Sequence, residues 1–165
     1  MSKGFQFCPK CATALVLSPH GGRDRPGCPA CGFVHWNNPV PVVAGIVETQ
    51  AGVVLVRNVG WPEAWFGLVT GFLEAKESPE AGVVREVAEE LGLTARIVDF
   101  VGLYPFPQAN QLIMAWHLEA DGPITLDPVE IAAYKVVPVD QLRPWPMGTG
   151  DAVKHWLARR LKPAS

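Results

Sequence analysis

The stretch from Gly71 to Leu93 constrains the fold more than any other part of the chain. It reads GFLEAKESPEAGVVREVAEELGL. Ser78 can cap a helix that starts at Pro79, because its hydroxyl oxygen can accept a hydrogen bond from a backbone N–H of the first turn. Gly92 can adopt the left-handed conformation that commonly ends a helix. The stretch therefore predicts a helix over residues 78–91 with a loop on each side.

Three carboxylates share one side of this helix: at about 100° of rotation per residue, Glu86, Glu89 and Glu90 fall within one arc. Such a face is ordinarily solvated surface. Here, however, Glu86 and Glu90 are four residues apart, and like charges at this spacing destabilise an isolated helix by about 0.2–0.5 kcal/mol. Mg²⁺ or Mn²⁺ would remove that repulsion, because both cations select carboxylate oxygens. The opposite arc should pack on the core and contains Ala81, Val83, Val84, Val87, Ala88 and Leu91.

The same stretch resembles the signature of the Nudix family, G-x5-E-x7-R-E-U-x-E-E-x-G-U, where U is aliphatic. Its defined positions are Gly71, Glu77, Arg85, Glu86, Val87, Glu89, Glu90, Gly92 and Leu93. The resemblance implies an α/β fold, an α/β/α sandwich with a mixed sheet. It also implies Mg²⁺- or Mn²⁺-dependent hydrolysis of a nucleoside diphosphate linked to a further group. By this resemblance Glu86, Glu89 and Glu90 hold the metals. Arg85 orients the loop carboxylate of Glu77, and water attacks a diphosphate phosphorus.

All four cysteines of the chain lie near its start, as the pairs Cys8/Cys11 and Cys28/Cys31 with sixteen residues between the pairs. Two C-x2-C pairs at this spacing predict one structural zinc ion bound by four thiolates. Disulfides and free thiols are the alternatives. The residues after Met1 lack an apolar signal core, so we expect a cytoplasmic, reducing location, where disulfides are rare. We place His35 beside the zinc site in a following strand, because four thiolates already complete a tetrahedral site.

Length, composition and charge agree with two domains. The chain has 165 residues, of which 48% are apolar, so it can bury a proper core. We expect a zinc ribbon over residues 1–38 and a Nudix hydrolase domain over residues 39–165. Residues 1–36 and 151–165 each carry a net charge of +3, which leaves −8 in the middle. An acidic centre fits a carboxylate metal site, whereas the basic ends are too weak to indicate a nucleic-acid binder. No apolar run is long enough to span a membrane.

Hydrophobic patterns predict the remaining elements. Residues 40–48 and 52–57 should form a β-hairpin, residues 58–63 a loop, and residues 65–72 the strand that leads into the signature. Further strands are expected over 95–104, 111–120 and 134–137, and an amphipathic helix over 150–161.

Two short segments resemble the NADH pyrophosphatase branch of the family. The signature opens with Thr70, Gly71 and Phe72, as that branch opens with a small residue, Gly and Phe. Downstream, residues 104–108 read YPFPQ, similar to the core of the branch signature SQPWPFPxS. Substrate contacts are therefore expected at Gly71, Phe72, Tyr104 and Phe106. A proline-rigidified loop with a buried aromatic side chain is the alternative for residues 104–108.

A fourth metal carboxylate is expected at Glu130, because NADH pyrophosphatases carry a Glu at a comparable place before the late strand. A surface Glu in a loop is the alternative there. Any of Glu86, Glu90 and Glu130 could act as the general base, because water on a metal has a lowered pKa.

Three classes of function compete. The first is hydrolysis of NADH or a related adenine dinucleotide to AMP and a second mononucleotide, with ADP-ribose or FAD as alternative substrates. The second is a catalytically inactive Nudix domain that senses a nucleotide, against which the intact carboxylates argue. The third is a ribbon that docks nucleic acid or protein, which its few basic residues disfavour. A small-molecule nucleotide is thus the expected partner, and a homodimer is a candidate assembly.

Overall fold

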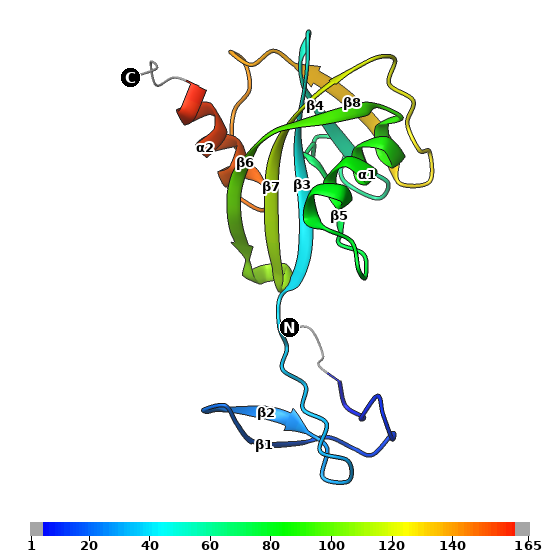
Figure 1. The fold of residues 1–165 in the computed structure, drawn as a ribbon, viewed down its shortest axis with the longest axis vertical. Helices are drawn as coiled ribbons and strands as arrows, with labels where there is room; N and C mark the ends of the chain where they lie inside the picture. Colours follow the sequence, from blue (N-terminus) through cyan, green and yellow to red (C-terminus); the bar gives the residue numbers. More distant parts are fainter. Residues whose placement is uncertain (1–4, 161–165) are drawn as a thin grey trace. The chain divides into compact units, whose positions relative to one another are not determined.

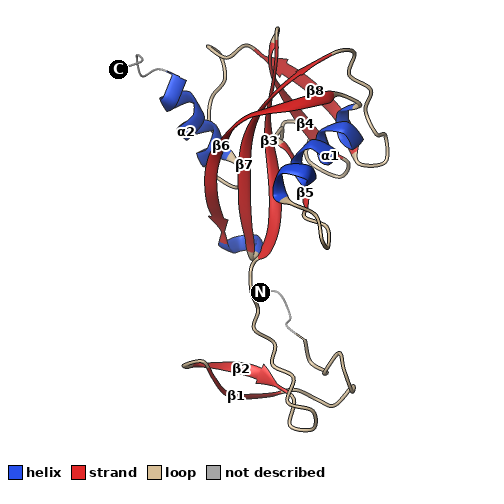
Figure 2. Cartoon of the chain, in the orientation of Figure 1, coloured by secondary structure: helices blue, strands red, loops and turns tan. Residues whose placement is uncertain are grey.

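The computed structural model describes residues 5–160, and the chain divides after Pro39 into two compact units. Figures 1 and 2 show the path of the chain and its elements. The first unit holds a two-stranded hairpin of β1 (Val16–His20) and β2 (Arg23–Gly27). Gly21 and Gly22 form its two-residue turn with φ of 59° and 76°. Positive φ at both positions is what a tight hairpin turn needs, and glycine adopts it without strain.

Two equivalent backbone turns bring the four cysteines together. The Cys8 N–H donates to the Thr13 carbonyl and the Cys8 carbonyl accepts from Ala12. Cys28 repeats this pattern with Phe33 and Gly32. The Sγ atoms of Cys8 and Cys31 are 3.5 Å apart, those of Cys11 and Cys28 3.5 Å, and those of Cys11 and Cys31 3.6 Å. Tetrahedral zinc with Zn–S bonds of about 2.3 Å places sulfurs about 3.8 Å apart. The four cysteines form no disulfide with one another, and their sulfur atoms lie at the spacing of a zinc site.

His35 is not in a strand, which corrects the sequence prediction. It follows an isolated bridge between Gly27 and Val34, and its backbone N–H donates to the Pro26 carbonyl. Its ring packs edge-on against Phe5 at 4.8 Å between centroids. The described metal-binding group consists of the four cysteines without His35.

The second unit is built on a six-stranded mixed sheet in the order β6-β7-β3-β4-β8, with β5 paired to β3. Its strands are β3 (Val40–Thr49), β4 (Gly52–Asn58), β5 (Val69–Phe72), β6 (Thr94–Phe106), β7 (Gln111–Asp121) and β8 (Ile131–Val137). The β3 and β7 strands are parallel, and every other described pair is antiparallel. A short 3₁₀ turn over Pro107–Ala109 joins β6 to β7.

One helix packs on each face of this sheet. The α1 helix (Pro79–Leu91) shares a core with Val43, Val54 and Leu118, and the α2 helix (Gly150–Arg160) packs on the other face with Ile46 and Leu55. Two faces of one sheet thus carry two separate cores. This arrangement confirms the predicted α/β/α sandwich with a mixed sheet. Each fully buried aliphatic side chain in these cores contributes about 1.5–3 kcal/mol.

Most predicted elements of this unit are present, with shifted ends. The hairpin of β3 and β4 and the α1 helix are confirmed, and the Ser78 hydroxyl accepts from the Ala81 N–H as predicted. The predicted strand over 65–72 is confined to β5, because Trp65 turns back to donate its N–H to the Pro62 carbonyl. The β6 and β8 strands are longer than predicted, and Leu161 lies outside the described residues.

The predicted division of α1 into an acidic face and an apolar face is wrong in part. Glu86 and Glu90 are buried beside Val83 and Val87. Ala81 and Ala88, which were expected to pack, are exposed. The carboxylates therefore occupy the edge of the packed face, where they line a pocket. Among residues 5–160, no helix is both long and apolar enough to cross a membrane.

The cluster of four cysteines yields a direct prediction of zinc binding. In the full chain, replacing Cys8 and Cys28 together by Ser should abolish zinc binding, because the two buried thiolates belong to different backbone turns. Small metal-bound units depend on the ion for folding, so amide hydrogen exchange should accelerate over residues 5–39. Ser18→Ala, in the hairpin, should keep its zinc. Elemental analysis that finds no zinc in wild-type protein purified without chelator would contradict the assignment.

Candidate active site

The α1 helix carries its carboxylates directly against the backbone of β5. A Cβ atom added to Gly71 would lie 1.8 Å from Cδ of Glu86. No heavy atoms can approach so closely, so only glycine fits at this position while Glu86 keeps its place. Gly71 pairs with Val43 in the middle of the sheet, which fixes the strand behind it. The glycine of the signature is therefore explained by a close approach of backbone to carboxylate.

Arg85 binds three carboxylates at once. Its Nε and Nη2 donate to Glu77 Oε1 and Oε2 at 2.8 and 3.0 Å, a bidentate pair. Its Nη1 donates to Glu86 at 2.7 Å and to Glu89 at 2.8 Å, and Nη2 also reaches the Phe72 carbonyl at 3.2 Å. Hydrogen bonds from Arg85 lower the pKa of Glu77. The expected orientation of Glu77 by Arg85 is present, and it fastens the loop before α1 to the helix.

Glu90 is the most deeply buried of the carboxylates. Its side chain is 1% exposed, and burial, together with the charges of Glu86 and Glu130, raises its pKa to about 8. Burial likewise raises the pKa of Glu86. The Oε2 atom of Glu90 has no hydrogen-bond partner within the described part of the chain. A buried oxygen without a donor, among like charges, is an arrangement that a cation stabilises.

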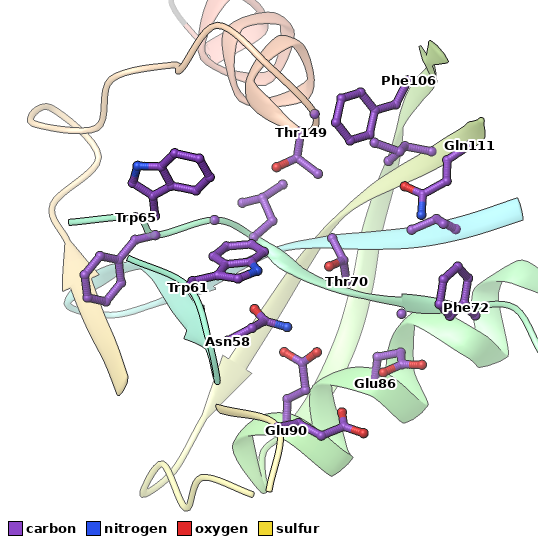
Figure 3. Close-up of a pocket in the computed structure, with 18 of the residues that line it drawn as sticks. Asn58, Trp61, Trp65, Thr70, Phe72, Glu86, Glu90, Phe106, Gln111 and Thr149 are labelled. Atoms are coloured by element: carbon purple, nitrogen blue, oxygen red, sulfur yellow. The ribbon is translucent and has the colours of Figure 1, made fainter. Parts of the chain in front are cut away.

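These side chains line a pocket of about 1180 Å³. Five carboxylates line it: Glu74 and four that are here called the carboxylate cluster, Glu86, Glu89, Glu90 and Glu130. The remaining lining includes six aromatic side chains, here called the aromatic wall: Trp61, Trp65, Phe66, Phe72, Phe106 and Trp145. Figure 3 shows Trp61 and Trp65 on one side of the pocket, Phe106 on the other, and Glu86 and Glu90 projecting from α1. Acidic and aromatic groups thus meet in one cavity.

The structure places most of the predicted site residues at this pocket. Gly71, Phe72, Phe106, Arg85 and the carboxylate cluster line it, and Glu77 accepts a hydrogen bond from Arg85. Tyr104 does not line it. Its side chain is buried in the core beneath α2, and its hydroxyl forms a hydrogen bond of 3.0 Å with His155 Nδ1. Tyr104 is therefore a core residue, as the alternative interpretation of its segment allowed.

The carboxylate cluster fits a divalent cation by its chemistry, although its oxygens are not drawn together. Within residues 5–160, only the four cysteines bring three or more ligand atoms within 4.8 Å of one another. Glu86 and Glu89 turn instead toward Arg85, whose Nη1 donates a hydrogen bond to each of them. The unpartnered Oε2 of Glu90 and the raised pKa of Glu90 are the features that a cation would relieve. We conclude that the residues suit Mg²⁺ or Mn²⁺.

Sequence reasoning missed part of the pocket. Asn58 and Trp61 were assigned to a loop and Trp65 to a strand, and no element or site was predicted for residues 145–149. The sequence held one signal for Asn58: it is a polar residue at the end of an apolar strand. The tryptophans come from two segments far apart in sequence, so their convergence depends on tertiary structure.

Comparison with known proteins agrees with this geometry. The profile of the NUDIX domain matches residues 38–156, so the chain belongs to the Nudix family. A solved NUDIX hydrolase from Nitrosomonas europaea superposes with a TM-score of 0.80 at 24% identity, covering 94% of this chain and 92% of the other. At that identity the similarity shows the fold alone.

Two curated relatives are named NAD-capped RNA hydrolase NudC. The protein from Pseudomonas aeruginosa strain LESB58 is 30% identical over 159 residues, which are 94% of this chain and 56% of that protein. The protein from Mycobacterium bovis strain BCG / Pasteur 1173P2 is 39% identical over 94 residues, 56% of this chain and 30% of that protein. The chain thus spans about half or less of the length of these relatives.

The contact between Gly71 and Glu86 can be tested alone. Gly71→Ala should weaken Mn²⁺ binding about 10- to 100-fold, the cost usual when the support of a metal ligand is lost, because the added Cβ would displace the Glu86 carboxylate. Isothermal titration calorimetry measures this affinity, and circular dichroism confirms folding. Gly67→Ala is the matched control, since its Cβ would meet Trp61 at an ordinary 3.4 Å. Wild-type Mn²⁺ affinity in Gly71→Ala would refute the steric argument.

Proposed function

We propose that the chain is a metal-dependent pyrophosphohydrolase that cleaves the diphosphate bond of a nucleoside diphosphate derivative. The substrate we favour is NADH or a related adenine dinucleotide, cut to AMP and a second mononucleotide. One observation carries the proposal: the carboxylate cluster and the aromatic wall line the same pocket. A diphosphate needs cations at its oxygens, and a planar base gains from stacking on aromatic rings.

Glu86, Glu89, Glu90 and Glu130 are the residues we assign to holding the cations. Bound Mg²⁺ or Mn²⁺ would neutralise charge on the diphosphate oxygens and lower the pKa of water. The protein keeps these carboxylates in place through Arg85, which also fastens Glu77. Glu86, Glu90 and Glu130 remain the candidates for the general base. Burial and neighbouring charges raise the pKa of Glu90 to about 8 in the cation-free protein, and a bound cation would lower it again.

The size and lining of the pocket support a dinucleotide over a small phosphate ester. Its volume of about 1180 Å³ exceeds the range of roughly 300–1,000 Å³ that is usual for small-molecule sites. Phe72 and Trp65 are more than half exposed, so their rings are available for stacking. The named function of the two bacterial relatives supports an NAD-containing substrate and adds NAD-capped RNA to the candidates. ADP-ribose and FAD are the alternatives, and an inactive nucleotide sensor is the alternative class.

The cation assignment predicts the effect of single amide substitutions. Glu89→Gln and Glu90→Gln should each lower kcat about 100-fold or more, because several kcal/mol of charge stabilisation depend on the cation. Thermal stability should hardly change, since each variant keeps the volume of the side chain and reduces the negative charge beside Glu86. Glu80→Gln, an exposed residue of the first turn of α1, is the control. Near-normal kcat in either pocket variant would exclude that residue as a ligand.

The substrate preference is tested by comparing kcat/KM, which measures discrimination in the transition state. The panel contains NADH, NAD, FAD, ADP-ribose, diadenosine polyphosphates, nucleoside triphosphates and a short NAD-capped RNA, with products identified by liquid chromatography. We expect an adenine dinucleotide to be cut at the diphosphate and nucleoside triphosphates to be far poorer. If ADP-ribose or FAD exceeds NADH tenfold, about 1.4 kcal/mol, the preferred substrate is wrong while metal-dependent hydrolysis stands. If no compound is cut with Mg²⁺ or Mn²⁺, the sensor alternative replaces the enzyme.

A further inference from the structure

Asn58 is a polar residue at the end of an apolar row. Side chains alternate between the two faces of a strand, so Val54, Val56 and Asn58 of β4 project toward the same face. The two valines are fully buried in the core beneath α1. Asn58 continues their row and reaches the pocket instead. A third aliphatic residue would fit the pattern of the strand. The presence of an amide at residue 58 therefore needs an explanation in its surroundings.

The amide oxygen of Asn58 has no hydrogen-bond donor. Over residues 5–160, the buried side-chain atoms without a partner are Asn58 Oδ1, Glu90 Oε2 and Arg57 Nε. Asn58 and Glu90 both line the pocket, and in the view of Figure 3 the Asn58 side chain lies between Trp61 and Glu90. Buried acceptors are almost always satisfied in folded proteins. Two of them in one cavity therefore indicate a ligand that interacts favourably with oxygen atoms.

The backbone links Asn58 to the fourth carboxylate. In the pairing of β4 with β8, Arg57 lies opposite Ala133 but Asn58 lies opposite Ile131, so Ala132 is an extra residue. Immediately beyond this bulge, the Val59 N–H donates to the Glu130 carbonyl at 2.8 Å. Bulges commonly re-aim side chains beside active sites. This bulge brings the backbone of Glu130 next to Asn58, the last residue of β4.

We propose that Asn58 is a positioning residue of the cation site, with Oδ1 serving as a neutral oxygen acceptor for the hydrated divalent cation. The inference rests on the proposed function, because it requires that the carboxylate cluster binds a cation. An amide oxygen is a hard acceptor of the kind that such cations use. It also adds no negative charge to a pocket in which four carboxylates already repel one another. A carboxylate at residue 58 would increase that repulsion in the cation-free protein.

The test measures Mn²⁺ binding without substrate, by calorimetry, together with the melting temperature in EDTA and in Mn²⁺. Asn58→Leu removes the acceptor at similar volume, and Asn58→Asp restores an acceptor while it removes the amide donor. Gln111→Leu is the matched control, because Gln111 is another amide of the pocket, beside Phe106 in Figure 3. Wild-type hydrolysis with Mn²⁺ is measured in parallel.

We expect Asn58→Leu to raise the Kd for Mn²⁺ about 10- to 100-fold and to reduce the increase in melting temperature that Mn²⁺ produces. In EDTA its melting temperature should equal or exceed that of the wild type, because an unsatisfied buried acceptor is removed. Asn58→Asp should recover most of the Mn²⁺ affinity, and Gln111→Leu should bind Mn²⁺ as the wild type does.

Three results would overturn the inference. Unchanged Mn²⁺ affinity in Asn58→Leu would leave Asn58 as a structural or base-contacting residue. An equal loss in Asn58→Asp and Asn58→Leu would indicate that the amide acts as a donor. Weaker Mn²⁺ binding in Gln111→Leu, to the same degree as in Asn58→Leu, would show a general effect of altering the pocket. If the wild type neither binds Mn²⁺ nor hydrolyses any substrate, the proposed function itself fails, which is a distinct outcome.

Discussion

The arrangement of the carboxylates on and before α1 depends on the ion pairs of Arg85. Its guanidinium holds Glu77 in a bidentate pair and reaches Glu86 and Glu89 on its own helix. Its side chain is 28% exposed and that of Glu77 only 15%, so the pair is screened less than a surface salt bridge. Arg85 forms ion pairs with three carboxylates, and none of its described hydrogen bonds goes to Glu90 or Glu130. The cluster therefore keeps an excess of negative charge, and a divalent cation is the simplest group that balances it.

The position of that cluster follows from how α1 meets the sheet. Val83, Val87 and Leu91 are fully buried against the sheet, and at 100° per residue Glu86 and Glu90 must then lie at the border of the packed face. Because Gly71 has no Cβ, the Glu86 carboxylate can lie directly against the backbone of β5. Apolar burial thus fixes the helix, and the missing Cβ lets a charged group approach the strand. Neither effect alone would place a carboxylate at the floor of the pocket.

The sequence predicted the parts of the site that are local, and it failed where the site depends on tertiary structure. Gly71, Glu77, Arg85 and the helix carboxylates lie within one strand end, the loop after it and one helix, so their spacing alone indicated a common surface. Phe106 and Tyr104 are two residues apart on β6, yet only Phe106 lines the pocket. The sequence could not predict this difference, because it depends on α2, whose His155 forms a hydrogen bond with Tyr104, while Phe106 ends the strand at the pocket. The aromatic wall joins residues 61–72 with Phe106 and Trp145, which only the tertiary fold brings together. The burial of Glu86 and Glu90 was missed because a charged residue is normally assigned to solvent.

The residues that break the local rules of this fold gather at one place. Glu90 is a nearly fully buried carboxylate, and Asn58 is an amide at the end of a buried valine row. Each would be more stable as an aliphatic residue in an isolated α/β sandwich, because an unsatisfied buried polar group destabilises the folded state. Their side chains line one pocket, and each has an oxygen without a donor. When exceptions to core packing converge on one cavity, the physical explanation is a ligand that favours oxygen atoms. Of the ligands that the proposed diphosphate hydrolysis needs, the divalent cation is the one with that property.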